Sequence, residues 1–330
     1  MLKENKKILI VKLGAIGDVI MALPMITYMK KENSLTEIFW VCGKTVFPIL
    51  KATNQVDHII VVDEQKLLKG NFFSKIFEIF KIWAKIGFKS FNKIITAYID
   101  RRYLLLTVLS FAKQRNSFSY TKGRKSLIYG RYMASEYLRL IDGKDDFILP
   151  SPIFPEIKCA LSKEFLLSLP ESFIVLAVGG SRNLSDDTLR SWPLEHYLAL
   201  AYELKKKGNN VVFTGIGINN NGFQDFINFI DKLDLLQLLA LYKRCALVIT
   251  HDGGSFHLAK LAGCPVLGVF GPTMPHSRFC EDGKTQIIWG GEKLSCRPCY
   301  DGKYYAACTD NKCMKGITVE RVLQEISAKL

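Results

Sequence analysis

Two glycine-punctuated turns, each lying between an apolar run and a helical pattern, constrain the fold of this chain more than any other feature. The apolar residues 8–11 precede the turn 12–18, and the apolar residues 248–250 precede the turn 251–255. Glycines let a backbone approach a ligand closely, and a helix N-terminus directs unpaired N–H groups at it. Both segments therefore predict strand–turn–helix units, and the second turn is suited to an anion. A turn that binds nothing is the alternative.

Short apolar runs alternate with helical periodicity along the whole chain. They lie at residues 8–11, 38–42, 59–62, 93–98, 173–178, 210–214, 247–250 and 266–270. Such strands separated by helices predict the α/β class, with parallel sheets of the doubly wound kind. A length of 330 residues with 48% hydrophobic residues favours two domains, each with its own core. The proline-bearing segment 149–155 would link them.

The residues of the two turns admit more than one role. Gly14 and Gly17 lack the G-x-G-x-x-G spacing and an acidic residue about twenty positions later, so a classical NAD site is not expected. Asp18 can project into a cleft as a catalytic carboxylate, or it can serve only to stabilise the helix N-terminus. Ser255 can cap the second helix, and Asp252 can hold a ribose or cap that helix itself.

A formal net charge of +14 requires an explanation in terms of an anionic partner. The cations of the N-terminal half that carry this excess are Lys66, Lys69, Lys75, Lys81, Lys85, Lys89, Lys93, Arg101, Arg102, Lys113, Arg115, Lys122, Arg124, Lys125 and Arg131. A nucleic-acid-binding protein would explain the charge, but no helix-turn-helix, zinc-finger or aromatic RNA-binding signature accompanies it, so nucleic acid is not the expected partner. The positive charge of these residues would equally attract a phosphorylated or carboxylated lipid head group.

The segment 72–91 combines aromatic residues with lysines. As a helix it would place Phe73, Ile76, Phe80 and Trp83 on one face, with Lys75, Lys85 and Lys89 opposite. Such a helix can lie on an anionic membrane or guide an amphiphilic substrate; the alternative is an ordinary helix packed on the sheet with a solvated lysine face. No apolar stretch reaches the ~18 residues of a spanning helix, and no secretory signal precedes the first strand. We expect a cytoplasmic protein, peripheral at the inner face of the cytoplasmic membrane.

The nine cysteines fall into two groups. Five lie in scattered apolar or loop contexts and are expected to be buried small hydrophobes or free thiols: Cys42, Cys159, Cys245, Cys264 and Cys280. The other four lie close together in the sequence: Cys296, Cys299, Cys308 and Cys313. They could form a structural zinc site, because four thiolates suit zinc, although the second pair is spaced by four residues. Reduced or oxidisable structural thiols are the alternative in a reducing compartment.

Four motifs, taken together and in order, resemble one family. They are the stretch 12–24 (KLGAIGDVIMALP), the tetrapeptide 190–193 (RSWP), the loop 252–258 (DGGSFHL) with 270–273 (FGPT), and the tail cysteines that end at Met314. In this combination the chain resembles glycosyltransferase family 9, the ADP-heptose:lipopolysaccharide heptosyltransferases. The resemblance spans nearly the whole chain. It implies a GT-B architecture, in which two Rossmann-like, doubly wound parallel-sheet domains face each other across a cleft.

The resemblance also implies a division of labour between the domains. Residues 1–152 would form an acceptor-binding domain, and residues 153–315 would form a domain that binds the nucleotide sugar. Residues 316–330 would form a C-terminal helix that can pack back on the N-terminal domain.

The family inverts the anomeric carbon by single displacement, and needs no metal and no cofactor. Asp18 matches the catalytic base, and Arg190 takes the place of a basic residue that binds the pyrophosphate. The donor- and phosphate-binding residues implied are Arg190, Ser181, Asp252, Gly253, Gly254, Ser255, His257, Gly215 and Thr273. The acceptor-binding residues expected are Lys12, Gly17, Arg101, Arg124 and Lys125. His257 has the plain alternative of a helix-face residue bonded to backbone.

The implied reaction moves heptose from ADP-heptose to a lipopolysaccharide core acceptor, either Kdo-lipid A or an inner-core heptose. Three departures from the family pattern, at 182–190, after Gly217 and at Gly253, leave another nucleotide sugar of core assembly open as the donor. A noncatalytic nucleotide- or lipid-binding protein of the same fold would also explain the two turns.

Overall fold

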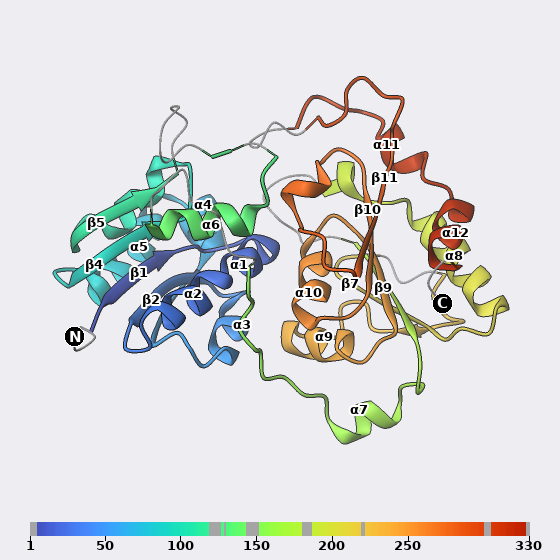
Figure 1. The fold of residues 1–330 in the computed structure, drawn as a ribbon, viewed down its shortest axis with the longest axis horizontal. Coiled ribbons are helices and arrows are strands. Elements are labelled where there is room, and N and C mark those ends of the chain that lie inside the picture. Colours follow the sequence, from blue (N-terminus) through green and yellow to red (C-terminus); the bar gives the residue numbers. More distant parts are fainter. Residues whose placement is uncertain are drawn as a thin grey trace. The chain divides into compact units, whose positions relative to one another are not determined.

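A computed structural model of the chain describes residues 5–118, 127–128, 130–142, 152–179, 187–218, 222–299 and 305–327. The chain divides into two compact units, Met1–Lys158 and Cys159–Leu330, which Figure 1 colours from blue to green and from green to red. The division lies a few residues beyond the predicted linker 149–155. Each unit holds its own sheet and its own core, as its length and hydrophobic content predict.

The first unit is built on a five-stranded parallel sheet in the order β3-β2-β1-β4-β5. Its strands are β1 Lys7–Val11, β2 Glu37–Gly43, β3 His58–Val62, β4 Ser90–Thr96 and β5 Phe111–Ser117. The first four confirm the predicted apolar runs. The fifth was not predicted, because β5 is an edge strand that leaves most of its side chains exposed and so has no apolar run.

Helices cover both faces of this sheet (Figure 1). They are α1 Ile16–Ala22, α2 Pro24–Glu32, α3 Phe47–Ala52, α4 Glu64–Lys69, α5 Phe72–Ile86, the 3₁₀ helix η1 Arg101–Thr107 and α6 Met133–Asp142. Leu9 and Val11 of β1 share one core cluster with Ile82 and Ile86 of α5. Because side chains alternate along a strand, Ile10 is buried on the opposite face.

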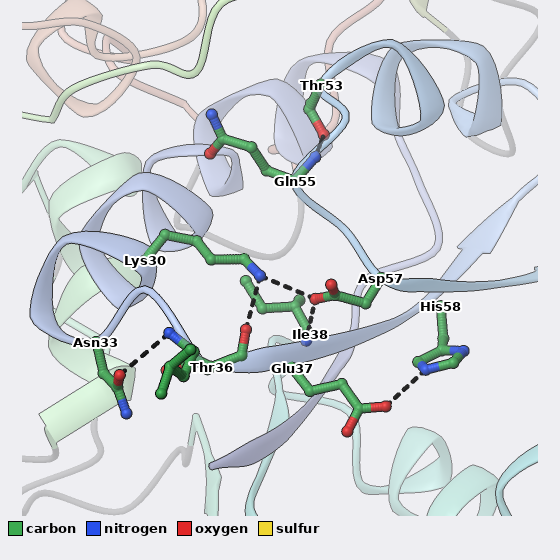
Figure 2. Close-up of polar contacts among 10 residues, drawn as sticks. Lys30, Asn33, Thr36, Glu37, Ile38, Thr53, Gln55, Asp57 and His58 are labelled. Atoms are coloured by element: carbon green, nitrogen blue, oxygen red, sulfur yellow. Dashed lines mark hydrogen bonds and ion pairs between the residues drawn. The ribbon is translucent and has the colours of Figure 1, made fainter. Parts of the chain in front are cut away.

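Polar contacts fix the amino ends of β2 and β3, as Figure 2 shows. Asp57 Oδ2 accepts hydrogen bonds from the backbone N–H of Ile38 at 2.8 Å and from Lys30 Nζ at 3.0 Å. His58 Nε2 lies 2.7 Å from Glu37 Oε1. These contacts bind α2 to the two strands. They stabilise the amino ends of the strands, whereas the glycine turn after β1 lies at the carboxyl ends.

The second unit is built on a six-stranded parallel sheet in the order β11-β10-β9-β6-β7-β8. Its strands are β6 Ile174–Val178, β7 Val211–Gly215, β8 Ile227–Asn228, β9 Leu247–His251, β10 Val266–Phe270 and β11 Thr285–Trp289. Four confirm predicted runs. The two edge strands were missed, because β8 has only two residues and β11 is only partly buried.

The helices of the second unit are α7 Lys163–Leu167, η2 Asp187–Arg190, α8 Leu194–Lys206, α9 Leu235–Tyr242, α10 Gly254–Ala262, η3 Pro275–Ser277, α11 Lys312–Lys315 and α12 Val319–Ser327. The predicted C-terminal helix corresponds to α12, and its packing back on the N-terminal domain stays a prediction. Val322 and Ile326 of α12 lie one helical turn apart and join Leu200 and Leu204 of α8 in the core of the second unit.

Both sheets are doubly wound, which confirms the predicted fold class. Strand order reverses between β1 and β4 in the first sheet and between β6 and β9 in the second. Ligands of such sheets bind outside the carboxyl ends of the strands at these reversal points. The turns after β1, β4 and β9 are therefore where a site is expected. Among the described residues no helix is long and apolar enough to cross a membrane.

Candidate functional site

An ion pair occupies the carboxyl end of β1, at the reversal point of the first sheet. Lys12 directly follows β1 and its side chain is only 3% exposed, whereas the side chain of Asp18, in the first turn of α1, is 35% exposed. Lys12 Nζ lies 3.2 Å from Asp18 Oδ2. The ammonium is therefore inside the protein, and the carboxylate opens toward solvent.

Aromatic rings enclose the Lys12 ammonium. Its Nζ lies 4.2 Å from the ring centroid of Tyr98 and 5.4 Å from that of Tyr137, distances at which a ring attracts a cation. Burial alone would lower the pKa of Lys12, but the charge of Asp18 and the contacts with Tyr137 outweigh it and raise this pKa above its ordinary value. Lys12 therefore keeps its charge, and that charge is directed at Asp18.

Tyr98 fixes the glycine turn from the end of β4. Its hydroxyl accepts hydrogen bonds from the backbone N–H of Leu13 at 2.9 Å and of Gly14 at 3.3 Å, and donates one to the Gly14 carbonyl at 3.1 Å. Burial raises the pKa of Tyr98, so the hydroxyl keeps its proton. Its ring stacks on Tyr103 with centroids 3.7 Å apart. Sequence reasoning did not assign Tyr98, although its place at the end of a predicted parallel strand was a usable signal.

The predicted acceptor residues are only partly brought together. Lys12 and Gly17 lie beside Asp18, with Gly17 buried inside α1. Arg101 is exposed at the start of η1. Arg124 and Lys125 lie outside the described residues. The arrangement at β1 suits proton abstraction from a hydroxyl, because a partly exposed carboxylate is held in place by a buried cation.

A second polar cluster lies at the carboxyl end of β9, at the reversal point of the second sheet. Asp252 is buried there; its Oδ2 accepts a hydrogen bond from Thr273 Oγ1 at 2.6 Å and lies 3.6 Å from Arg190 Nη1. Burial would raise the pKa of Asp252, but Arg278, Arg190 and the Thr273 hydroxyl together lower it below its ordinary value. Three residues predicted for the donor site therefore meet in one place, and Arg278 joins them without having been predicted.

His251 stands beside this cluster as a neutral imidazole. Its Nδ1 lies 3.1 Å from the Tyr197 hydroxyl. Burial, assisted by the charge of Arg190, lowers the pKa of His251 to about 4. His251 therefore adds no charge to this cluster, whose charged groups include Arg190, Arg278 and Asp252.

The start of α10 differs from both capping predictions. Gly253 is the N-cap with extended backbone, and no side chain caps this helix in the described structure. Ser255 lies in the first turn, where it hydrogen-bonds the Tyr242 hydroxyl, and Asp252 faces Thr273. The first N–H groups of α10 are thus available to an anion, and the phosphate-binding role of this loop stays a prediction. His257 is buried in the same helix, and its electrostatic effect also lowers the pKa of Asp252.

The remaining predicted donor residues are placed differently. Gly215 ends β7, where a side chain would collide with the carbonyl of Val178 on β6, so close strand approach explains this glycine. Ser181 lies outside the described residues. A cavity of 440 Å³ lies along β11, and it is lined by Pro275, His276, Phe279, Glu281, Gly283, Thr285, Ile287 and Trp289. Asp252 is not among its lining residues.

Two of the tail cysteines, Cys299 and Cys313, lie against the loop that follows β10. The backbone N–H of Cys299 donates to the Pro272 carbonyl at 3.1 Å, and a side chain at Gly271 would touch Cys313 Sγ. All nine cysteines are free thiols. Across the described part of the chain no group of three or more His, Cys, Asp or Glu is arranged to hold a metal ion. Cys296, Cys299, Cys308 and Cys313, which were considered as possible zinc ligands, are thus not arranged as a metal site in the described structure.

Known proteins resemble this chain in sequence and in fold. The family model "Glycosyltransferase family 9 (heptosyltransferase)" matches residues 169–305. The lipopolysaccharide core heptosyltransferase OpsX of Haemophilus influenzae is 23% identical, over 80% of this chain and 79% of its own length.

Two solved structures share the whole fold. The glycosyl transferase family 9 protein of Veillonella parvula superposes with a TM-score of 0.75 at 19% identity, covering 99% of this chain and 98% of its own. The E. coli heptosyltransferase WaaC with ADP-2-deoxy-2-fluoro heptose superposes with a TM-score of 0.70 at 17% identity, covering 98% of this chain and 100% of its own. The family match over residues 169–305 and the relative identify the chain as a glycosyltransferase that is similar to glycosyltransferase family 9.

Proposed function

We propose that this enzyme transfers heptose from ADP-heptose to a lipopolysaccharide core acceptor. The observation that carries the proposal is the convergence of Arg190, Asp252 and Thr273 beside the uncapped start of α10. A cation and free N–H groups at a reversal point suit the diphosphate of a nucleotide sugar. The relative OpsX is named a lipopolysaccharide core heptosyltransferase, and the WaaC structure holds an ADP-heptose analogue.

The donor diphosphate would bind at the N-terminus of α10, with Arg190 as its bidentate partner. Asp252 would then act on Arg190, because a buried carboxylate 3.6 Å away orients the guanidinium. When the bond between the anomeric carbon and the diphosphate breaks, negative charge grows on the leaving oxygen. Arg190 and the N–H groups would stabilise that charge without a metal ion.

Asp18 would take the proton of the acceptor hydroxyl. The oxygen then attacks the anomeric carbon from the side opposite the diphosphate, so the new bond forms as the old one breaks and the configuration inverts. Lys12 would orient Asp18 for this step rather than touch the acceptor, because its ammonium is buried and already faces that carboxylate.

An exposed apolar surface in the first unit suits contact with an anionic membrane. We name it the α5 surface; its exposed apolar members are Phe72, Phe73, Phe77, Phe80, Phe88, Leu104, Leu105, Val108 and Phe111. The alternative of an ordinary packed helix would bury its aromatic face, yet α5 packs on the sheet through Ile82 and Ile86 and leaves the Phe73 side chain 80% exposed. Large exposed apolar patches commonly mark binding surfaces.

The charge of this region supports the same partner. Residues 66–115 contain eleven lysines and arginines but only two acidic residues, Glu78 and Asp100. Glu78 is paired with Lys81, and Asp100 is paired with Arg102. An apolar surface in a region with a large excess of cations fits lipid tails and anionic head groups together. The enzyme would thus work peripherally, at the inner face of the cytoplasmic membrane.

A donor screen tests the proposed function. The protein is incubated with a lipopolysaccharide core acceptor and, in turn, ADP-heptose, ADP-glucose, a UDP-sugar or a GDP-sugar, and products are identified by mass spectrometry. We expect a mass increase of one heptose with ADP-heptose. Transfer from another nucleotide sugar alone would replace the donor in this proposal. Donor binding without transfer to any acceptor would favour a noncatalytic protein.

A further inference from the structure

Glu64 places a second carboxylate at the edge of the first sheet that holds Asp18. It begins α4 directly after β3. A side chain at Gly14, in the turn after β1, or at Gly43, at the end of β2, would collide with the Glu64 carboxylate. The Glu64 carboxylate therefore lies next to the carboxyl ends of both β1 and β2, near the Lys12–Asp18 ion pair.

The Glu64 carboxylate makes no polar contact within the described structure. Among the described residues no hydrogen bond or ion pair engages its carboxylate, which is only partly buried. Burial raises the pKa of Glu64, and the nearby Lys12 only partly opposes this. Lys12 neutralises the charge of Asp18 more than that of Glu64, because its ammonium lies 3.2 Å from Asp18 and is enclosed by Tyr98 and Tyr137.

Such a carboxylate has two consequences for a ligand. It can accept hydrogen bonds from hydroxyl groups, which a sugar supplies in pairs. It also repels a phosphate or another carboxylate at short range, since no cation of its own cancels its charge. The same position therefore attracts a neutral polyol and rejects an anion.

We propose that Glu64 is a specificity-determining residue, which binds hydroxyl groups of the acceptor sugar next to Asp18 and selects against an acceptor phosphorylated at that place. This inference rests on the proposed function in one respect, namely that the acceptor is a saccharide bound at the β1 edge. It concerns the acceptor alone and leaves the identity of the donor open.

The test compares wild-type protein with Glu64→Gln, which keeps the shape and removes the charge. Each is assayed with the same core saccharide in phosphorylated and dephosphorylated form. We expect Glu64→Gln to raise the KM for the dephosphorylated acceptor about 10- to 100-fold, the effect of losing a hydrogen bond to a charged group. We also expect the ratio of kcat/KM for phosphorylated over dephosphorylated acceptor to rise, with the dissociation constant of the donor unchanged.

Two further variants separate specificity from structure. Glu64→Asp keeps the charge but shortens the side chain, so it should raise the KM and yet retain the discrimination against phosphate. Gln65→Ala changes the exposed neighbour on α4 and should leave both quantities unchanged. The thermal midpoint of each variant shows whether the turn still folds.

The possible results distinguish failure of the role of Glu64 from failure of the proposed function. An active wild type whose acceptor KM and phosphate preference survive in Glu64→Gln would overturn the role of Glu64 while leaving the proposed function intact. A general loss of activity toward both acceptors in equal proportion, with a lowered thermal midpoint, would assign Glu64 a structural role and also overturn it. A wild type that transfers no sugar to any acceptor would instead overturn the proposed function.

Discussion

Lys12 and Asp18 form an ion pair that is buried at one end and open at the other. The Lys12 ammonium is enclosed by Tyr98 and Tyr137, and the Asp18 carboxylate reaches the surface 3.2 Å away. A base that abstracts a proton must be both held in place and accessible to its substrate. This pair meets both demands, with Lys12 directly after β1 and Asp18 in the first turn of α1.

Asp18→Asn should lower the rate of transfer by roughly 10²–10⁴-fold, because the change removes a positioned base at constant size. The affinity for the donor, measured by calorimetry, should stay within a few fold, since the donor residues lie on the second unit. A variant that turns over at the normal rate would reduce Asp18 to a residue of the helix terminus.

Arg190→Ala should weaken binding of the nucleoside diphosphate about 10- to 100-fold and lower kcat as well. A charge-assisted contact with phosphate acts on both the bound donor and the departing diphosphate. Arg190→Lys is the matched control and should restore part of the affinity, because it keeps the charge but loses the bidentate geometry. Unchanged diphosphate affinity in Arg190→Ala would remove this residue from the donor site.

The stability of the protein should fall in mild acid because of His251. Its pKa is near 4 in the folded protein and about 6.5 when unfolded, so only the unfolded state takes up a proton between these values. The contribution is complete above about pH 6.5 and is lost as the pH falls toward 4, amounting to about 3 kcal/mol. Urea unfolding of wild type and His251→Gln at several pH values measures it. A pH dependence that His251→Gln leaves as it was would contradict this assignment.

Replacing Lys75, Lys85 and Lys89 together by glutamine should reduce binding to vesicles that contain anionic lipid. Each cation near such a surface contributes on the order of 1 kcal/mol, so three should matter where one would not. The acceptor KM should rise, and donor binding should not change. Vesicle sedimentation at low salt, where the attraction is least screened, measures the effect.

The apolar part of the same surface is tested separately. Phe73→Ser combined with Phe77→Ser should also weaken vesicle binding, because both side chains are exposed on α5.

The lysine variant has a matched control, which replaces three exposed lysines of the second unit, Lys205, Lys206 and Lys207, by glutamine. If this control loses as much vesicle binding as the Lys75, Lys85 and Lys89 variant, the attraction is one of net charge and the α5 surface is not the site.

The sequence by itself determined the strands that lie inside the two sheets. A strand covered on both faces must be apolar along its length, so β1, β2, β6 and β10 are visible as runs. The edge strand β5 has mostly exposed side chains and the edge strand β11 has mostly half-buried ones, so neither was predicted from an apolar run. The two glycine turns could also be predicted from the sequence, because each follows a buried strand. Asp18 and Asp252 lie in or next to these turns.

Only the tertiary structure decided which residues meet across those turns. Arg190 and Asp252 lie far apart in the sequence, and they approach because η2 and the end of β9 reach the same edge of the second sheet. Glu64 meets Gly14 and Gly43 for the corresponding reason in the first, where parallel pairing aligns the ends of β1, β2 and β3. Local patterns report burial and backbone conformation, whereas these contacts depend on strand order, which hydrophobic periodicity along the chain does not encode.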